Sequence, residues 1–133
     1  MCISKFTKEH QDKLYLVFRI LVGLMFFAHG AQKLFGWFGG QPQAIASLMG
    51  VAGVIEVVGG MLIALGLFTR PAALLSAAQM IVAFVKVHLP MGLIPIMNKG
   101  ELSLLYFAAF LILLVYGNGI WSLEKTLFGK ERW

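Results

Sequence analysis

The sequence predicts an all-α fold, a bundle of four transmembrane helices. Hydrophobic residues occupy 59% of the 133 positions and charged residues only 13%, whereas a soluble domain of this size needs a far more polar surface. The apolar residues also form four stretches that approach or exceed the roughly 20 residues needed to cross a bilayer. The expected spans are residues 14–35, 48–68, 71–89 and 102–120.

The distribution of positive charge predicts the orientation of these spans. With both termini in the cytoplasm, eight of the eleven lysines and arginines lie on the cytoplasmic side: Lys5, Lys8, Lys13, Arg19, Arg70, Lys125, Lys130 and Arg132. The positive-inside rule therefore favours an N-in, C-in protein, with Arg19 and Arg70 as cytoplasmic anchors. The net charge of +5 follows from this orientation and from anionic lipid, so no nucleic-acid partner is expected.

The first span begins after a basic segment and ends among small residues, a pattern shared with cleaved signal peptides. We expect this helix to be retained, because four spans agree with the charge distribution. Residues 1–13 and 121–133 then form cytoplasmic tails, and the short connections leave residues 1–133 as a single membrane domain. Near the outer end of the first span, His29 and Lys33 stand four residues apart and share a helix face.

The second span carries Glu56 on the same face as Gly53 and Gly60. Glycines let a neighbouring helix approach closely, so Glu56 is expected to face protein instead of lipid. A charged side chain at mid-bilayer costs about 2.5–3.5 kcal/mol, which favours pairing it with a counter-ion, here Lys33 or Lys86. In the alternative interpretation both lysines extend to the outer headgroups.

The third span ends with Lys86 and His88, which lie about 200° apart around a regular helix, so both cannot point into the bundle. Pro90 follows, and residues 88–100 are expected to form a re-entrant or interfacial loop. Glu101 opens the fourth span, whose core, "LSLLYFAAFLILLVY", carries no charge but brings the hydroxyls of Ser103 and Tyr106.

This topology gathers ionisable residues in the outer leaflet and predicts a site there. Histidine ionises near neutral pH and suits proton exchange or hydrogen bonding to a carbonyl. The expected residues for binding or proton exchange are His29, Lys33, Glu56, His88 and Glu101. No metal site is expected, because no pair has a recognised ligand spacing. The lone Cys2 forms neither a disulfide nor a redox pair, so the chain is not expected to catalyse electron transfer alone.

Five segments of the chain resemble successive blocks of the DoxX family of bacterial inner-membrane proteins. They are "RILVGLMFFAHGAQKLFGWFGG", "IEVVGGMLIALGLFTRPAALL", "VKVHLPMG", "KGELSLLY" and "YGNGIWSLEK". The resemblance covers nearly all of the chain beyond its first dozen residues. It implies a four-helix bundle in a bacterial inner membrane, with relatives that serve as small subunits of thiosulfate:quinone oxidoreductase. The histidine, lysine and two glutamates of the family pattern fall on His29, Lys33, Glu56 and Glu101, its loop histidine falls on His88, and its acidic position after Ser-Leu falls on Glu124.

Two functions follow as hypotheses. The first is an accessory or quinone-facing subunit of a membrane-associated oxidoreductase system, with a quinone as ligand and with redox-enzyme subunits or a second copy of the chain as partners. This hypothesis rests largely on the family resemblance. The alternative is a small transporter, or a membrane scaffold whose buried ion pair only stabilises the bundle.

Overall fold

The computed structural model describes residues 2–132, and all regular structure in that range is helical. The longer elements are α1 (Ile3–Phe35), α2 (Leu48–Leu65), α3 (Thr69–Ala83), α4 (Pro95–Asn98), α5 (Glu101–Tyr116) and α6 (Leu123–Phe128). The shorter ones are η1 (Trp37–Gly39), the π-helical η2 (Phe84–His88) and η3 (Leu89–Met91). The all-α prediction is confirmed, and α1, α2, α3 and α5 are the four helices of the bundle.

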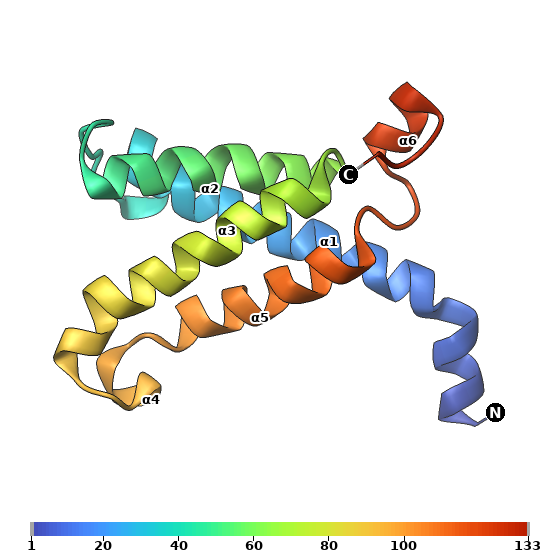
Figure 1. Cartoon of the computed structure of the whole chain (residues 1–133), viewed down its shortest axis with the longest axis horizontal. Coiled ribbons are helices and arrows are strands. Elements are labelled where there is room, and N and C mark those ends of the chain that lie inside the picture. Colours follow the sequence, from blue (N-terminus) through green and yellow to red (C-terminus); the bar gives the residue numbers. More distant parts are fainter. Residues whose placement is uncertain (1, 133) are drawn as a thin grey trace.

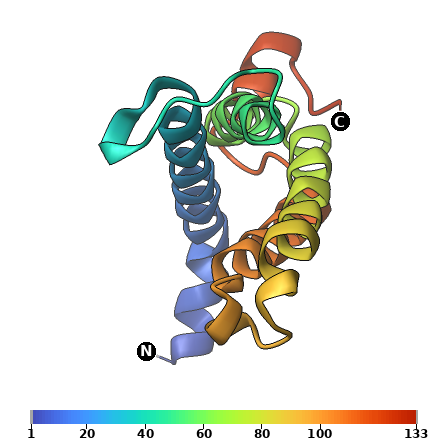
Figure 2. The same ribbon diagram turned by 90° about the vertical axis from the view of Figure 1, so that its left-hand side faces the viewer.

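The four helices form two pairs. Helix α1 lies beside α2, and α3 lies beside α5 (Figures 1 and 2). Both chain ends, the α2–α3 turn and α6 lie at one end of the bundle, which we call the tail end (Figure 1). The connections 36–47 and 84–100 lie at the other, which we call the loop end. An even number of helices therefore returns the chain to the end at which it starts.

Glycines bring α1 and α2 into backbone contact. A Cβ atom at Gly60 would lie 2.4 Å from the backbone nitrogen of Phe27, and one at Gly30 would lie 2.5 Å from that of Val57. Neither helix can carry a larger residue there without moving, which is how small residues let membrane helices pack. The predicted close approach at Gly53 and Gly60 is confirmed, because both glycines contact α1.

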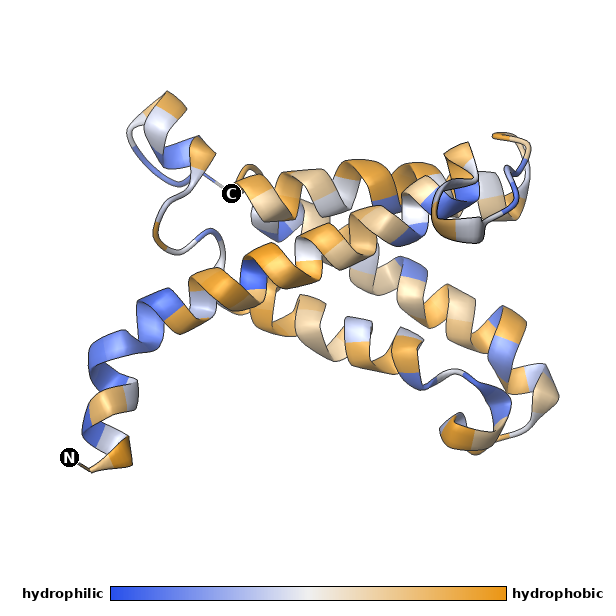
Figure 3. Ribbon diagram, turned by 180° about the vertical axis from the view of Figure 1, so that it is seen from behind, coloured by the Kyte–Doolittle hydropathy of each residue, from blue (hydrophilic) through white to orange (hydrophobic). Residues whose placement is uncertain are grey.

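Helix α3 presents small side chains to the aromatic face of α5. The two pairs join in one buried core, to which α1 and α2 each contribute a large side chain, Phe26 and Ile63. The remaining core residues belong to α3 and α5: Ala72, Ala73, Ala77, Met80, Tyr106, Phe110 and Leu113. Outside this core the long helices expose apolar side chains, such as Val58 at 52% and Leu105 at 67% (Figure 3). Such a surface suits lipid instead of water.

Three of the helices are long and apolar enough to cross a membrane, namely α1, α2 and the helical stretch Thr69–Met91. Helix α5 is equally apolar but has 16 residues. It ends at Tyr116, before the predicted limit of 120, because Gly117 takes a φ of 69° that few other residues adopt. At the other terminus α1 begins at Ile3, so the predicted tail is helical from that residue on. Residues 1 and 133 lie outside the described range.

Residues 88–100 form a loop that contains short helical turns. It contains η3 and α4, and it exposes Leu93 at 81%, Ile96 at 71% and Met97 at 74%. Asn98 is fully buried and shapes this loop, because its amide donates to Gly92 O (2.7 Å) and its carbonyl oxygen accepts from Gly100 N (2.8 Å).

Candidate functional site

A cavity of about 310 Å³ opens between the helices in the loop-end half of the bundle. We call it the loop-end cavity. Its apolar walls include Phe26 and Met80 from the core. Its polar residues come from α1, α2, α3, η2, the loop before α5 and α5 itself: His29, Lys33, Glu56, Gln79, His88, Lys99, Ser103 and Tyr106. An apolar cavity with a few convergent polar groups is the usual form of a small-molecule site.

Glu56 forms the centre of the polar cluster. It lies between the glycines of α2 that face α1, and only 2% of its side-chain surface is exposed. Lys33 of α1 forms an ion pair with Glu56 Oε1, and Gln79 of α3 donates to the same oxygen over 2.8 Å. Lys33 keeps 23% of its side chain exposed, so its ammonium is the less buried half of the pair. Three helices therefore meet at one carboxylate oxygen.

Three buried polar atoms in the residues around the cavity have no hydrogen-bond partner among residues 2–132. They are Glu56 Oε2, Gln79 Oε1 and the Tyr106 hydroxyl. Flipping the side-chain amide of Gln79 cannot give its oxygen a hydrogen-bond partner, because Nε2 is needed where it is to donate to the carboxylate of Glu56. Buried polar atoms in proteins nearly always have a partner, so these three are the atoms that a water molecule or a polar ligand would satisfy.

The two histidines of the cavity come from different elements, His29 from α1 and His88 from η2. The His29 ring stands edge-on to Tyr106, with centroids 5.8 Å apart and planes at 88°. His88 ends the π-helical turn η2, and its Nδ1 lies 3.1 Å from Asn98 O in the loop before α5. One histidine therefore lies beside Tyr106, and the other contacts the loop before α5.

The structure brings together four of the five predicted binding residues: His29, Lys33, Glu56 and His88 all line the cavity. Glu101 does not, because it is exposed in the first turn of α5. Lys86, a candidate counter-ion, faces another groove and makes no ion pair among the described residues. Within residues 2–132, no three histidine, cysteine or carboxylate side chains gather as metal ligands.

Gln79 and Lys99 belong to the cavity but were not predicted. Gln79 lies seven residues before Lys86 on the same face of the helix, and this spacing could have placed it near the other polar residues. It was missed because the prediction selected charged residues and histidines, and glutamine is neutral. Lys99 has a φ of 63° at the end of α4, and this turn brings it to the cavity. No periodicity in the sequence predicts such a turn.

At the tail end, Arg19, which was predicted as a cytoplasmic anchor, binds backbone carbonyl groups of the protein itself. It is 1% exposed, and its guanidinium donates to Asn118 O, to Ile120 O (3.0 Å) and to Trp121 O (3.0 Å). Arginine suits this role because its planar fork offers five donors in fixed directions. Arg19 therefore holds the loop after α5 against α1.

The side chain of Asn118 completes this tail-end network. It accepts from the hydroxyl of Thr69 and donates to Glu124, and all three residues are at most 1% exposed. Arg70 is less buried; it donates to Leu114 O over 3.1 Å and pairs with Glu131 over 2.7 Å. Residues of the "YGNGIWSLEK" block thus connect α1, α3 and α6 through buried hydrogen bonds.

Comparison with known proteins places the chain in a family. The sequence model of DoxX matches residues 14–89. A Haemophilus influenzae protein named only as uncharacterized is 39% identical over 92% of this chain and 97% of its own length. The "Putative oxidoreductase CatD" of Bacillus subtilis is 32% identical, covering 87% of this chain and 89% of its own. The "Inner membrane protein YqjF" of Escherichia coli is 30% identical, covering 95% and 99%.

No solved structure matches the chain. The family match nevertheless covers more than half of the residues, and the relatives align over nearly their whole lengths. With apolar helices that are long enough to cross a bilayer, this chain is a membrane protein of the DoxX family.

Proposed function

We propose that this DoxX protein is an accessory, quinone-facing subunit of a membrane-associated oxidoreductase, and that the loop-end cavity binds the head group of a quinone or its hydroquinone. The observation that carries the proposal is Glu56, a carboxylate buried in an apolar helix with one oxygen that no group in residues 2–132 satisfies. A buried charge is costly in a membrane protein and marks a functional site by default.

The unfilled atoms fit the chemistry of such a head group. A hydroquinone carries two hydroxyl donors, and Glu56 Oε2 and Gln79 Oε1 are two unfilled acceptors in the residues around the cavity. A quinone carries two carbonyl acceptors, for which the Tyr106 hydroxyl and the remaining N–H groups of Lys33 are donors. The volume of about 310 Å³ is at the lower end for ligand pockets, which suits a single ring.

The partner in this proposal supplies the redox centre. The Bacillus subtilis relative is named as an oxidoreductase, which supports an association with redox chemistry. Cys2, the single cysteine of the chain, lies at the tail end and far along α1 from the cavity residues. We therefore propose that this chain binds and positions the quinone, exchanging protons through His29 or His88, while another subunit transfers the electrons. A second copy of this chain is the alternative partner.

We further propose that the whole chain, residues 1–133, is one domain of a bacterial inner membrane with both termini in the cytoplasm. The inner-membrane name of the Escherichia coli relative supports the location. The excess of lysine and arginine at the tail end supports the orientation. The loop-end cavity then lies in the outer leaflet.

A second candidate is a scaffold in which the polar cluster only locks the bundle. The observation in its favour is that Lys33 and Gln79 reach Glu56 from two other helices, so that α1, α2 and α3 are tied together. Polar contacts between membrane helices stabilise a bundle whether or not a ligand is present.

Purification in mild detergent distinguishes the two candidates. Wild type, Glu56→Gln and the matched control Glu101→Gln are compared, because Glu101 is an exposed carboxylate outside the cavity. Glutamine keeps an acceptor for Lys33, whose partly exposed ammonium can reach water, so Glu56→Gln should still fold.

Mass spectrometry of co-purifying molecules is the readout. We expect a quinone and a redox-enzyme subunit with wild type and Glu101→Gln, and neither with Glu56→Gln at a similar melting temperature. If no variant retains a quinone and Glu56→Gln only melts earlier, the scaffold interpretation holds.

A further inference from the structure

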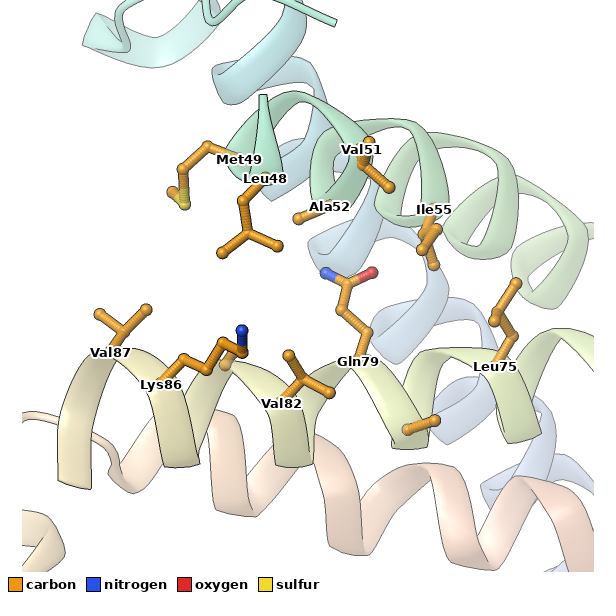
Figure 4. A pocket seen from close by; sticks show the side chains of 12 residues that line it. Leu48, Met49, Val51, Ala52, Ile55, Leu75, Gln79, Val82, Lys86 and Val87 are labelled. Atoms are coloured by element: carbon orange, nitrogen blue, oxygen red, sulfur yellow. The ribbon is translucent and has the colours of Figure 1, made fainter. Parts of the chain in front are cut away.

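A second space lies on the lipid-facing side of the gap between α2 and α3. It is a groove of about 270 Å³, which we call the side groove (Figure 4). Its walls are almost entirely apolar: Leu48, Val51 and Ile55 from α2, and Leu75, Val82 and Val87 from α3 and η2. Gln79 and Lys86 are the polar residues among the described residues that line it.

The side groove and the loop-end cavity share walls. Met49 and Ala52 of α2, and Gln79 and Ala83 of α3, line both spaces. The two spaces therefore adjoin across the same interhelical gap, with one facing the bundle interior and the other facing lipid. Figure 4 shows the Gln79 side chain reaching from α3 toward α2, below Ala52.

The width of the gap between α2 and α3 changes along the two helices. Toward the tail end α2 and α3 are joined by a short turn and come close at Gly59, where a Cβ atom would lie 2.9 Å from Ser76 Oγ, and the space between the helices there is smaller, about 190 Å³. Toward the loop end the gap is bordered by small side chains, Ala52 and Ala83, and α3 changes into the π-helical η2. π-Helical turns are frequent at functional sites because they redirect side chains.

We infer that the side groove holds the hydrocarbon chain of the quinone whose head group occupies the loop-end cavity, and that the gap between α2 and α3 is the route by which the head group enters from the bilayer. This inference rests on the proposed function. The occupant is specified by continuity: an apolar groove that shares walls with a polar cavity fits one molecule with an apolar chain and a polar ring. Lipid is as apolar as the groove, so the chain gains affinity from close packing and not from leaving water.

Two ligands and two variants test the inference. The ligands are decylubiquinol and the same dimethoxy-methyl hydroquinone without its decyl chain, both titrated onto the purified full chain in nanodiscs. Val82 lines the side groove and not the loop-end cavity, so Val82→Trp places its added volume in the side groove. Val17→Trp is the matched control, because Val17 is a lipid-facing valine of α1, 54% exposed, that lines neither space.

With the concentration of each ligand counted in the nanodisc lipid, so that partitioning of the decyl chain into the bilayer does not contribute, we expect wild type and Val17→Trp to bind decylubiquinol about tenfold more tightly than the chainless hydroquinone. In Val82→Trp this advantage should disappear, while the affinity for the chainless ligand stays unchanged. Equal affinity of wild type for the two ligands, or an advantage that survives in Val82→Trp, would overturn the inference and leave the proposed function standing.

Two other results separate the remaining possibilities. If wild type binds neither ligand, the proposed function fails and the inference fails with it. If native mass spectrometry finds a phospholipid that is lost in Val82→Trp, while decylubiquinol binding is unaffected, the groove belongs to a lipid acyl chain and the inference is overturned.

Discussion

At the scale of single residues, the loop end of the bundle depends on Glu56. Its carboxylate is almost completely buried, and removal of two charges from water costs more than their attraction returns unless other hydrogen bonds assist. Lys33 supplies the opposite charge and Gln79 supplies a further donor to the same oxygen. The remaining oxygen, Oε2, has no hydrogen-bond partner within residues 2–132 and is the atom that the proposed ligand would satisfy.

Removal of Lys33 should therefore destabilise the protein more than removal of both partners. We expect Lys33→Met to lower the free energy of unfolding by about 3–5 kcal/mol, because it leaves a buried carboxylate without a counter-ion. The double variant Lys33→Met with Glu56→Met should recover most of this loss. Denaturant unfolding in detergent micelles measures both values.

Lys86→Met is the control for this comparison. Lys86 is exposed and unpaired among the described residues, so its loss should change the free energy of unfolding by no more than about 0.5 kcal/mol. If Lys33→Met had as small an effect as Lys86→Met, the ion pair would contribute nothing to stability.

Charge and depth in the sequence were enough to select most of the polar residues around the cavity. The cost of burying Glu56 and its position between two glycines predicted that it faces protein. The sequence could not show whether Lys33 or Lys86 is the counter-ion of Glu56, because this depends on how the helices are rotated relative to each other. Glu101 was placed in the cluster from its leaflet and from the family pattern, yet it is exposed in the first turn of α5, where the helix dipole stabilises a carboxylate.

At the scale of helices, the contact between α1 and α2 depends on the absence of side chains. Gly60 brings its own backbone against that of Phe27, whereas the neighbouring Gly59 faces the side chain of Ser76. A rigid backbone cannot yield as a side chain can, so the two adjacent glycines differ in what they tolerate.

Gly60→Ala should lower the free energy of unfolding by about 1–3 kcal/mol, because its methyl group must push α1 and α2 apart. Gly59→Ala should cost less, since Ser76 can rotate away, and it serves as the control. Thermal unfolding of the two purified variants in the same detergent gives the comparison. Equal melting temperatures would show that the α1–α2 contact is looser than described.

Helix boundaries were predictable where apolar stretches end at polar residues, and less so elsewhere. The second span matches α2 closely at its start, because Ser47 caps the helix by accepting from Gly50 N over 3.0 Å. The π-helical turn of η2 and the tail-end network around Asn118 were not predicted. The tail-end network depends on contacts between segments that are distant in the sequence, such as Thr69 with Asn118.

At the scale of the whole molecule, the two ends of the bundle differ in what they contain. The tail end is filled by the buried network of Arg19, Asn118 and Glu124, whereas the loop end contains the cavity. The chain begins and ends at the tail end (Figure 1). A filled end and an open end suit a protein that binds its ligand from one leaflet only.

The single cysteine of the chain provides a test of orientation. Cys2 is exposed at the start of α1, and the hydrogen bond with the Ser4 hydroxyl lowers the pKa of its thiol, which favours the thiolate that maleimide attacks. We expect a membrane-impermeant maleimide to label Cys2 in inside-out vesicles and not in intact spheroplasts.

The control moves the cysteine to the loop end. In the variant Cys2→Ser with Gln41→Cys, labelling should occur in spheroplasts instead, because Gln41 is exposed in the connection between η1 and α2. Labelling of Cys2 from outside would place the cavity in the cytoplasmic leaflet.

The most direct test of the central claim, that the loop-end cavity binds a quinone head group, is the effect of Tyr106→Phe on hydroquinone binding. The Tyr106 hydroxyl has no partner within residues 2–132, so its removal should not lower the melting temperature of the ligand-free protein. Titration of the chainless hydroquinone onto wild type and Tyr106→Phe should show binding weakened about fivefold or more. An unchanged affinity, or a loss of stability in the absence of ligand, would contradict the account.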